Sequence, residues 1–563
     1  MVQNTREMLS GRRHNLFKTG TAAAALAAAV LSATFAYGQD APVTLAQADA
    51  APPTAPNAAA NTERPSNQVS TFVGSLIPGF QLNARVNLAE TYSTNATGSS
   101  AAGNHDDWLT AAGIGLDIHD HSRRVSFDAN YSGQVYYYAN SATSTQFTND
   151  LQAMASIIAI PDYLNFIARA FAQPVILSNS GFATANGIVG PNGYRNSYGY
   201  SLGPDITFKL GNFAVSDTTA TYGGAYFTDP SGFSNILIPG VAGPENITSR
   251  DVTEILKSGD DFSRLRWTAV GEFSETDRNQ GLFSEKAAVV TFTYGLTPEI
   301  ALLTTGGYEA IHNSLGLSKN LSGPVGMGGV ELTFGPDFDL MVQAGEKFNS
   351  LSFLGSLRWN ITATASLTGL ATDTVSTPEG QLLNNLSSMT ASLNGTLTTA
   401  ENIYSNGSVS SLGSSFSAQS LGSLSFTQSI SRYQRVSFTF SEDYERDHIH
   451  ATLYGEKLTQ LDRFFIGSPV TESWGLQAGY SHNITREITG SLSAGYGYYQ
   501  ELGGHSKNYD VSGQVDYALG PLTNIYFRSD YLRRDSSTSL QNLSPFTGSL
   551  DDIRVTIGLN RQL

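Results

Sequence analysis

Residues 124–138 read RVSFDANYSGQVYYY, and their side chains alternate between apolar and hydrophilic along the whole stretch. A β-strand sends successive side chains to opposite faces, so the pattern predicts one strand with an apolar face and a hydrophilic face. The apolar face comprises Val125, Phe127, Ala129, Tyr131, Gly133, Val135 and Tyr137, and the hydrophilic face comprises Ser126, Asp128, Asn130, Ser132, Gln134 and Tyr136. Such a strand is longer than the roughly five or six residues that are usual in soluble sheets.

The same alternation recurs from about Phe80 to Leu563. Clear examples are SRLRWTAVGEF (263–273), LSFLGSLRW (351–359), RVSFTFSEDYE (435–445) and NYDVSGQVDYAL (508–519). A soluble sandwich also alternates, but its strands are shorter and a single sandwich does not extend over so much chain. A β-helix would show a short fixed repeat, which is absent from this sequence. The pattern therefore predicts an all-β protein, a transmembrane antiparallel β-barrel of about 22 strands with both ends periplasmic.

The connections between the predicted strands fall into two length classes, as expected for short periplasmic turns and long outer loops. The short connections are HDHS (119–122), PDY (161–163), LGN (210–212), SGDD (258–261), GLTPE (295–299), GPDFD (335–339), SRY (431–433) and ALGPL (518–522), and the longer ones are 93–106, 174–193, 228–248, 310–322, 373–415 and 447–469. Some of the longer connections carry apolar residues such as Ile236, Leu237, Ile238, Leu382 and Leu383. These residues favour loops that fold inward, so the predicted lumen is either open or plugged.

Composition agrees with a membrane barrel. Charged residues make up only 14% of the chain, and 32 Lys and Arg stand against 55 Gly, 26 Tyr and 29 Phe, which is unusual for a soluble protein. The absence of cysteine excludes disulfides, zinc-thiolate sites, a catalytic thiol and a lipid anchor on an N-terminal Cys. A net charge of −16 argues against nucleic acid as a partner.

The N-terminus predicts export. Four basic residues precede an uncharged run over 19–36, and Ala36 and Gly38 suit a cleavage site, so residues 1–38 are expected to be a cleaved signal peptide. Residues 39–79 are Ala/Pro-rich and are expected to form a disordered periplasmic leader, which leaves residues 80–563 for the barrel. The predicted location is the outer membrane of a Gram-negative bacterium, with lipid and lipopolysaccharide around the barrel.

Tyrosines near the predicted strand ends suit the aromatic girdles of a membrane interface, although cross-strand packing explains them equally well. They are Tyr136, Tyr137 and Tyr138, Tyr198 with Tyr200, Tyr222 with Tyr226, Tyr496 with Tyr498 and Tyr499, and Tyr526 with Tyr531.

Several stretches resemble a known family. They are LNARVNLAETYSTNA (82–96), LGNFAVSDTTATY (210–222), FSRLRWTAVGEFSET (262–276) and YGLTPEIALLTTGGYE (294–309). Together they resemble the outer-membrane β-barrels associated with exopolysaccharide loci and PEP-CTERM systems, a family of β-barrel porins. The resemblance implies a role in passing polysaccharide outward, with polysaccharide and periplasmic export components as partners. It brings no assigned site residues.

Charged residues on the hydrophilic faces are the candidate functional residues. In a wide barrel they would line water and set a preference for ions or sugars, or else simply solvate the lumen by pairing across strands. The candidate lumen-lining residues are Arg85, Arg264, Arg266, Glu272, Arg358, Arg435, Asp443, Asp510, Asp516, Arg528 and Asp530.

No catalytic or cofactor motif accompanies them. The sequence contains no G-x-S-x-G, H-E-x-x-H, phosphate-binding loop or EF-hand pattern. His119 and His121, and His448 and His450, lie at predicted turns or strand ends where solvated histidines are common. We therefore expect no enzyme activity, cofactor or metal. The alternatives to a polysaccharide-linked channel are a general diffusion porin, a structural or adhesive surface barrel, and a barrel enzyme that uses His448 and His450.

The chain ends in RVTIGLNRQL (554–563), which alternates like the other strands. It is expected to close the barrel by pairing with the first strand near residues 80–92, which would leave no free edge. It also resembles the C-terminal signal that outer-membrane barrels present to their insertion machinery, although Leu563 stands where an aromatic residue is usual. Arg561 falls on the lipid side and is expected to reach water at the periplasmic interface.

Overall fold

The computed structural model describes residues 80–96, 106–140, 145–176, 194–227, 246–278, 281–314, 321–377, 430–461, 470–501, 504–537 and 549–563, with Gly380, Leu383, Leu386, 390–391 and 397–398 between them. The predicted signal peptide and leader lie outside these residues. No helix in the described part of the chain is long and apolar enough to cross a membrane.

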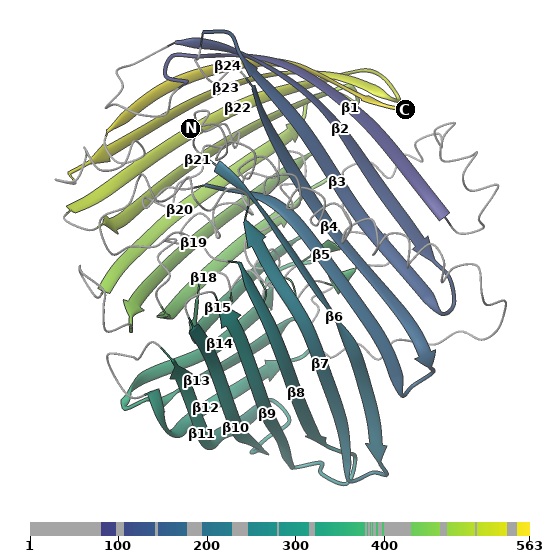
Figure 1. The fold of residues 1–563 in the computed structure, drawn as a ribbon, viewed down its shortest axis with the longest axis vertical. Helices are drawn as coiled ribbons and strands as arrows, with labels where there is room; N and C mark the ends of the chain where they lie inside the picture. Colours follow the sequence, from purple (N-terminus) through teal and green to yellow (C-terminus); the bar gives the residue numbers. More distant parts are fainter. Residues whose placement is uncertain are drawn as a thin grey trace, which may run out of the picture.

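Twenty-two strands form a single antiparallel sheet that closes on itself, because β1 pairs with both β2 and β24. The first eleven are β1 (Phe80–Ser93), β2 (Asp107–His121), β3 (Val125–Tyr138), β4 (Thr145–Ile160), β5 (Leu164–Ile176), β6 (Tyr194–Leu210), β7 (Ala214–Phe227), β8 (Ile247–Ser258), β9 (Leu265–Arg278), β10 (Gly281–Gly295) and β11 (Ile300–Asn313). The second eleven are β12 (Leu321–Phe334), β13 (Phe338–Lys347), β14 (Ser350–Asn360), β15 (Ala365–Ser376), β18 (Ser431–Asp443), β19 (Asp447–Gln460), β20 (Val470–Asn483), β21 (Ile488–Glu501), β22 (Gly504–Gly520), β23 (Thr523–Ser536) and β24 (Leu550–Gln562). Figure 1 shows these strands running obliquely around the barrel. The predicted fold class and strand number are confirmed.

Barrel closure follows the prediction made from the last ten residues. Strand β24 pairs with β1 from Arg85↔Gln562 to Ser93↔Arg554. The backbone N–H of Leu563 donates to the Ala84 carbonyl at 2.8 Å, which extends the ladder to the last residue. A closed sheet has no edge whose backbone groups would need another partner.

Short turns gather at one end of the barrel, for example at 161–163, 211–213, 335–337 and 444–446. Asp162, Gly211 and Gly335 in these turns have φ near +60°, a conformation that glycine adopts without steric cost. Several predicted connections are wrong or displaced. Residues 119–121 belong to β2, whose turn follows at 122–124, and residues 518–520 belong to β22. Residues 431–433 begin strand β18, and most of 447–469 belongs to β19, which starts after the true turn at 444–446.

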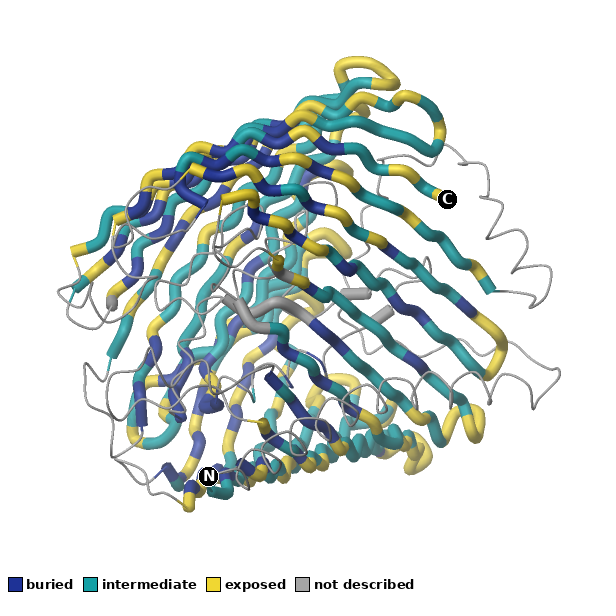
Figure 2. Tube along the Cα trace, turned by 45° about the horizontal axis from the view of Figure 1, so that its top comes forward, coloured by how far each residue is buried: buried dark blue, intermediate teal, exposed yellow. Residues whose placement is uncertain are grey.

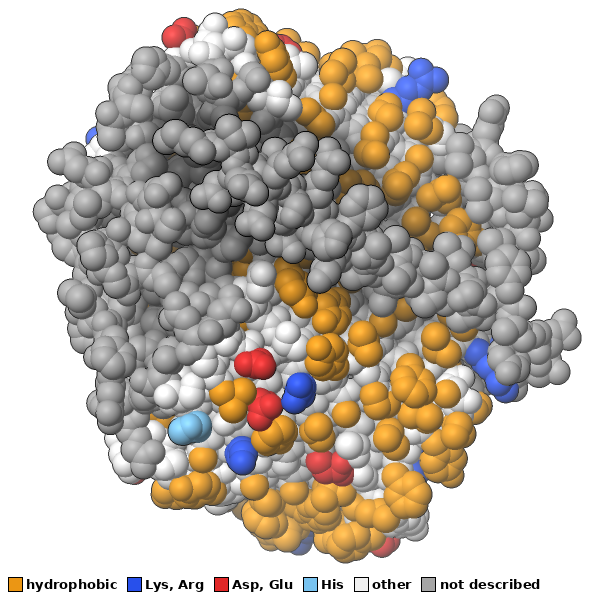
Figure 3. Space-filling model, in the orientation of Figure 1, with side chains coloured by type: hydrophobic (Ala, Val, Ile, Leu, Met, Phe, Trp, Pro, Cys, Tyr) orange, Lys and Arg blue, Asp and Glu red, His pale blue; other side chains and the backbone are white. Residues whose placement is uncertain are grey.

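Burial alternates along the strands as the sequence predicts (Figure 2). On β3, Val135 and Tyr137 are exposed, whereas Asp128 and Tyr136 are buried. The exposed face of the barrel is rich in apolar side chains, which form a broad hydrophobic surface around the strands (Figure 3). A closed sheet with a hydrophobic outer face is the arrangement that lets a β-structure cross lipid without leaving backbone groups unsatisfied.

Aromatic residues gather near both ends of this surface. Trp108 contacts Tyr92 and Trp474 contacts Tyr496 near the end with long connections, with ring centroids 5.3 and 5.2 Å apart. The predicted girdles are only partly right. Tyr136, Tyr138 and Tyr499 point into the barrel and are buried, so they belong to the inner packing.

Candidate functional site

The inner wall of the barrel is polar over long stretches. On β22, Ser506, Asn508, Asp510 and Ser512 are buried, whereas the large apolar residues of the same strand are exposed on the outside: Tyr509, Val511, Val515, Tyr517 and Leu519. Several polar atoms of this inner row have no hydrogen-bond partner among protein groups, including both amide atoms of Asn508. Buried polar groups without partners are costly, so this row favours contact with water or with a polar solute.

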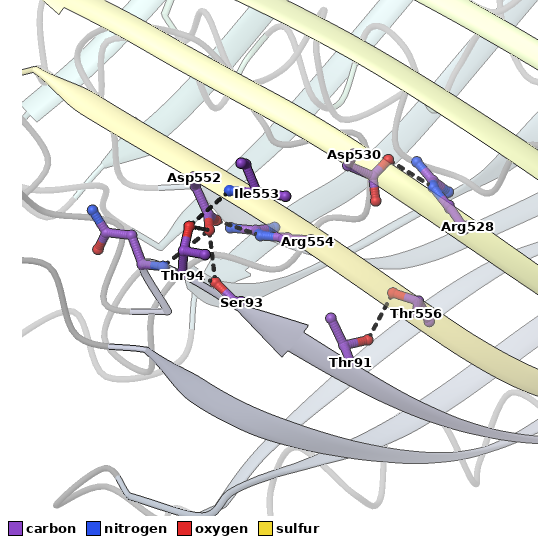
Figure 4. Close-up of polar contacts among 10 residues, drawn as sticks. Thr91, Ser93, Thr94, Arg528, Asp530, Asp552, Ile553, Arg554 and Thr556 are labelled. Carbon is purple, nitrogen blue, oxygen red and sulfur yellow. Dashed lines mark hydrogen bonds and ion pairs between the residues drawn. The ribbon is translucent and has the colours of Figure 1, made fainter.

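Several side-chain hydrogen bonds join the wall where the barrel closes. Asp552 on β24 accepts hydrogen bonds from the Ser93 hydroxyl at 2.8 Å, the Asn95 backbone N–H at 3.0 Å and Arg554 Nε at 2.6 Å. Nearby, the hydroxyls of Thr91 and Thr556 are 2.9 Å apart (Figure 4). We call this group, from β24 and the outer end of β1, the closure network. It joins the first and last strands through side chains as well as through the ladder.

Charges in this region are paired along a strand rather than left free. Arg554 binds Asp552, and Arg528 Nε donates to Asp530 Oδ1 at 2.8 Å on β23 (Figure 4). Partners two residues apart on a strand lie on the same face, so each pair is held against the wall. The result is a polar surface on which opposite charges are adjacent.

Glycines let large side chains lie flat against the wall. The Arg85 side chain covers Gly115 of β2, where a Cβ would lie 2.3 Å from Arg85 Nε. The Asp510 carboxylate covers Gly495 of β21 in the same way, 2.2 Å from where a Cβ would be. A side chain at either glycine would push its neighbour toward the lumen.

The structure places the candidate lumen-lining residues as follows. Arg264 lies in the turn before β9, and the other ten lie in wall strands. Most of these residues have a charged or hydrogen-bonding partner. The pairs are Arg85 with Asp117 (3.6 Å), Arg266 with Glu331 (3.0 Å), Arg358 with Asp339 (4.0 Å), Arg435 with Glu456, Asp443 with His448 (2.8 Å) and Arg528 with Asp530. Asp516 accepts a hydrogen bond from the Gln514 side-chain amide. Glu272 lies on β9 on the same face as Arg266, and Asp510 is buried on β22. The candidates are thus spread around the ring in separate pairs and do not converge on one centre.

Sequence reasoning missed three inner or buried ion pairs: Asp552 with Arg554, Glu309 with Lys347 at 2.9 Å, and Asp373 with Arg432. The alternation in DDIRVTIG (551–558) already places Asp552, Arg554 and Thr556 on one face, so it was a usable signal for the first pair. The other two join residues far apart in the sequence, which no local pattern reveals.

Part of the connection between β15 and β18 lies across the ring from β15. It contains two short strands, β16 (Thr390–Ala391) and β17 (Leu397–Thr398), which pair with each other. Cα atoms of β17 lie within 8 Å of β3 and of β4. Strands β4 and β15 are eleven strands apart in the closed sheet of 22, so they lie on opposite sides of the barrel. Leu383 and Leu386 in this connection are buried, as an inward-folding segment requires.

The histidines of the described strands lie beside carboxylates or at strand ends. Within the described ranges, no group of three or more His, Cys, Asp or Glu side chains is arranged to hold a metal ion. His119 and His121 both contact Asp128, at 3.1 and 3.2 Å. His448 and His450 begin β19, directly after the short turn at 444–446, and so lie at the end of the barrel opposite the long connections.

No protein-family model and no curated protein sequence matches the chain. Similar solved structures include the siderophore receptor PirA from Pseudomonas aeruginosa, at 11% identity and a TM-score of 0.41, covering 86% of this chain and 80% of that one. PirA from Acinetobacter baumannii is similar at 8% identity and a TM-score of 0.44, covering 85% and 80%. OprD from Pseudomonas aeruginosa is similar at 9% identity and a TM-score of 0.31, covering 86% and 95%. At these values the likeness says nothing about what this chain binds or transports.

Proposed function

We propose that the protein is an outer-membrane channel for a polar solute, and that the solute is an exopolysaccharide chain on its way out of the cell. The observation that carries the channel is the contrast between the two faces of the closed sheet. The outer face presents a broad apolar surface, and the inner face presents hydroxyl, amide and paired charged groups. A barrel of this strand number encloses a lumen wide enough for a passage or a plug.

The choice of a sugar chain rests on the character of the inner wall and on the family resemblance. On the inner face of β22, the side chains of Ser506, Asn508 and Ser512 are buried and have hydroxyl or amide atoms without a hydrogen-bond partner among protein groups, so this part of the wall calls for water or another polar group. Charges such as those of Arg528 and Asp530 are already paired with each other. A neutral hydroxyl-rich polymer matches such a surface better than a free ion does, because it exchanges hydrogen bonds with the wall without breaking the ion pairs.

The experiment is conductance in planar bilayers with neutral oligosaccharides added to either side. We expect open-channel current that oligosaccharides reduce in a concentration-dependent way. Gln134→Leu on the inner face of β3, where the side chain is half-buried, should weaken this reduction, whereas Val135→Leu, the next residue but on the outer face, should not. A large, steady current that sugars do not affect would refute the polysaccharide proposal and favour a general diffusion porin. A barrel that never conducts would refute the channel itself and favour a structural or adhesive role.

The enzyme alternative has its own test. His448 and His450 are its best candidates, and His448 already contacts Asp443. Cells or vesicles that carry the His448→Ala, His450→Ala double variant should keep any hydrolytic activity associated with the barrel. Loss of such an activity in the double variant, with the barrel still folded, would favour the enzyme.

A further inference from the structure

Charged side chains interrupt the hydrophobic outer surface of the barrel on one side. The ladders place Arg250 of β8, Glu275 of β9 and Ser284 of β10 opposite one another, and His312 of β11 continues the row. Residues opposite each other in a ladder share a face. Tyr222 of β7, which lies opposite Arg250 and is 43% exposed, shows that this face is the outer one. Figure 3 shows basic and acidic side chains side by side in the lower half of the hydrophobic surface.

Lys286 adds a second cation two residues further along β10. It lies opposite Phe273 of β9, and its Nζ is 5.5 Å from the centre of that ring. Because Phe273 is 38% exposed on the outside, Lys286 belongs to the outer face as well. Among the described residues, no carboxylate pairs with Lys286. We call Arg250, Glu275 and Lys286 the outer charged patch.

The ion pair within the patch is a loose one. Arg250 Nη1 is 3.6 Å from Glu275 Oε1, and the two side chains are 67% and 31% exposed. Exposed pairs of this kind contribute about 0–1 kcal/mol, so a stronger partner readily competes for the arginine. A guanidinium has five N–H donors in one plane, and this contact leaves room for others. Both cations of the patch are therefore available to an anion on the membrane side.

The patch lies at the depth where lipid headgroups are expected. Strand β8 begins after the long connection 228–246, and Arg250 is its fourth residue, so roughly 10 Å of strand separates it from the outer end. Three tyrosines gather beside it on the outer face, with the Tyr200 ring centroid 6.3 Å from that of Tyr222 and 6.1 Å from that of Tyr226. Tyrosine is enriched at the boundary between the apolar core of a membrane and its headgroups. Charges at this depth meet phosphates and sugars.

The wall on the periplasmic side of the patch suits acyl chains. Val252 of β8 and Phe273 of β9 lie opposite each other on the outer face and are half-exposed. Glu254 follows on the same face of β8, but the hydroxyls of Ser216 and Thr218 donate to its carboxylate, so it is satisfied within the wall. An amphipathic molecule thus finds charges for its headgroup and apolar side chains for its tails.

The carboxylates of the patch narrow down the kind of headgroup. Glu275 and Asp277 are two residues apart on β9 and share the outer face. They repel a ligand that offers only negative charge. A phosphorylated sugar offers both kinds of group, because its phosphate accepts hydrogen bonds from Arg250 and Lys286 while its hydroxyls donate to the carboxylates.

We propose that the outer face of β7 to β11 binds a phosphorylated glycolipid of the outer leaflet, with one phosphate between Arg250 and Lys286. These residues are two strands and two residues apart, which is roughly 12 Å between Cα atoms. Two long side chains that point toward each other across this distance reach a single phosphate. The inference rests on the outer-membrane location of the barrel and not on the solute proposed for the lumen.

The test is native mass spectrometry of the full chain in detergent micelles, with diphosphoryl lipid A, the acylated glucosamine disaccharide of lipopolysaccharide, as the probe. We expect a saturable complex with one lipid A. The Arg250→Gln, Lys286→Gln double variant should bind it at least about tenfold more weakly, because hydrogen bonds to charged groups are lost. The Arg250→Lys, Lys286→Arg double variant keeps both charges and should retain most of the binding. Circular dichroism verifies that each variant is folded.

The matched control is the Lys507→Gln, Arg533→Gln double variant. These cations also face outward near the outer ends of β22 and β23, almost opposite β8 in the ring. The control should bind lipid A as the parent does. An equal loss in both double variants would show a general attraction between charges and would overturn the site, as would a parent that retains no lipid A.

Two further lipids test the assignment of the headgroup. Lipid A without its phosphates should bind at least about tenfold more weakly than the diphosphoryl form, because the contacts with both cations are lost. Phosphatidylglycerol has a phosphate but no sugar and should not displace diphosphoryl lipid A at equal concentration. If either lipid competes equally, the phosphorylated glycolipid is the wrong ligand. None of these outcomes alters the conductance of the barrel, so failure of the lipid site and failure of the proposed channel are distinguishable.

Discussion

Asp552 offers the sharpest test of how the barrel is held closed. Its side chain is fully buried and accepts hydrogen bonds from Ser93, the Asn95 backbone and Arg554. Replacing Asp552 by Ala leaves the Arg554 guanidinium, which is 3% exposed, without its carboxylate. Removing one partner of a buried ion pair costs about 3–5 kcal/mol, so the variant should lose about that much free energy of unfolding.

The assay is urea unfolding of the barrel in lipid vesicles, followed by tryptophan fluorescence. Asp551→Ala is the control, because Asp551 is the neighbouring carboxylate on the opposite, exposed face of β24. The double variant Asp552→Ala, Arg554→Met should recover most of the loss, because it removes the unpaired charge as well. An Asp552→Ala barrel within about 0.5 kcal/mol of the parent, or a double variant no more stable than the single one, would refute the reasoning.

Three further predictions concern the wall and the lumen. Gly115→Leu should displace the Arg85 side chain toward the lumen and lower single-channel conductance in planar bilayers, because a Cβ there lies 2.3 Å from Arg85 Nε. Ile557→Arg should destabilise the barrel in vesicles by about 2–4 kcal/mol in a urea titration, because Ile557 is an exposed apolar residue near the middle of β24. Replacing residues 378–429 by a short Gly/Ser linker should raise single-channel conductance, because β17 in this connection reaches the far side of the ring. Unchanged conductance would show that the connection does not obstruct the passage.

The alternation of side chains predicted most of the fold because it is a local property. Each residue of β22 reveals its face through its immediate neighbours, so the sequence alone assigns Asp510 and Asp516 to the hydrophilic face without any tertiary information. Turn residues such as Gly211 and Gly335 then mark where a strand must end. The strand number followed from these two signals, since a barrel adds one strand for each turn.

The errors arose where a local signal has two meanings. Residues 431–433 are polar and follow a Ser-rich stretch, so they resembled a turn, but they begin β18, where Arg432 forms an ion pair with Asp373 on β15. Tyr138 has an apolar ring that suits a lipid interface and a hydroxyl that suits a polar lumen. Only its packing against Leu109 and Ala111 shows that it points into the barrel. The closure network and the Asp373–Arg432 ion pair each join residues far apart in the sequence, which alternation alone does not reveal.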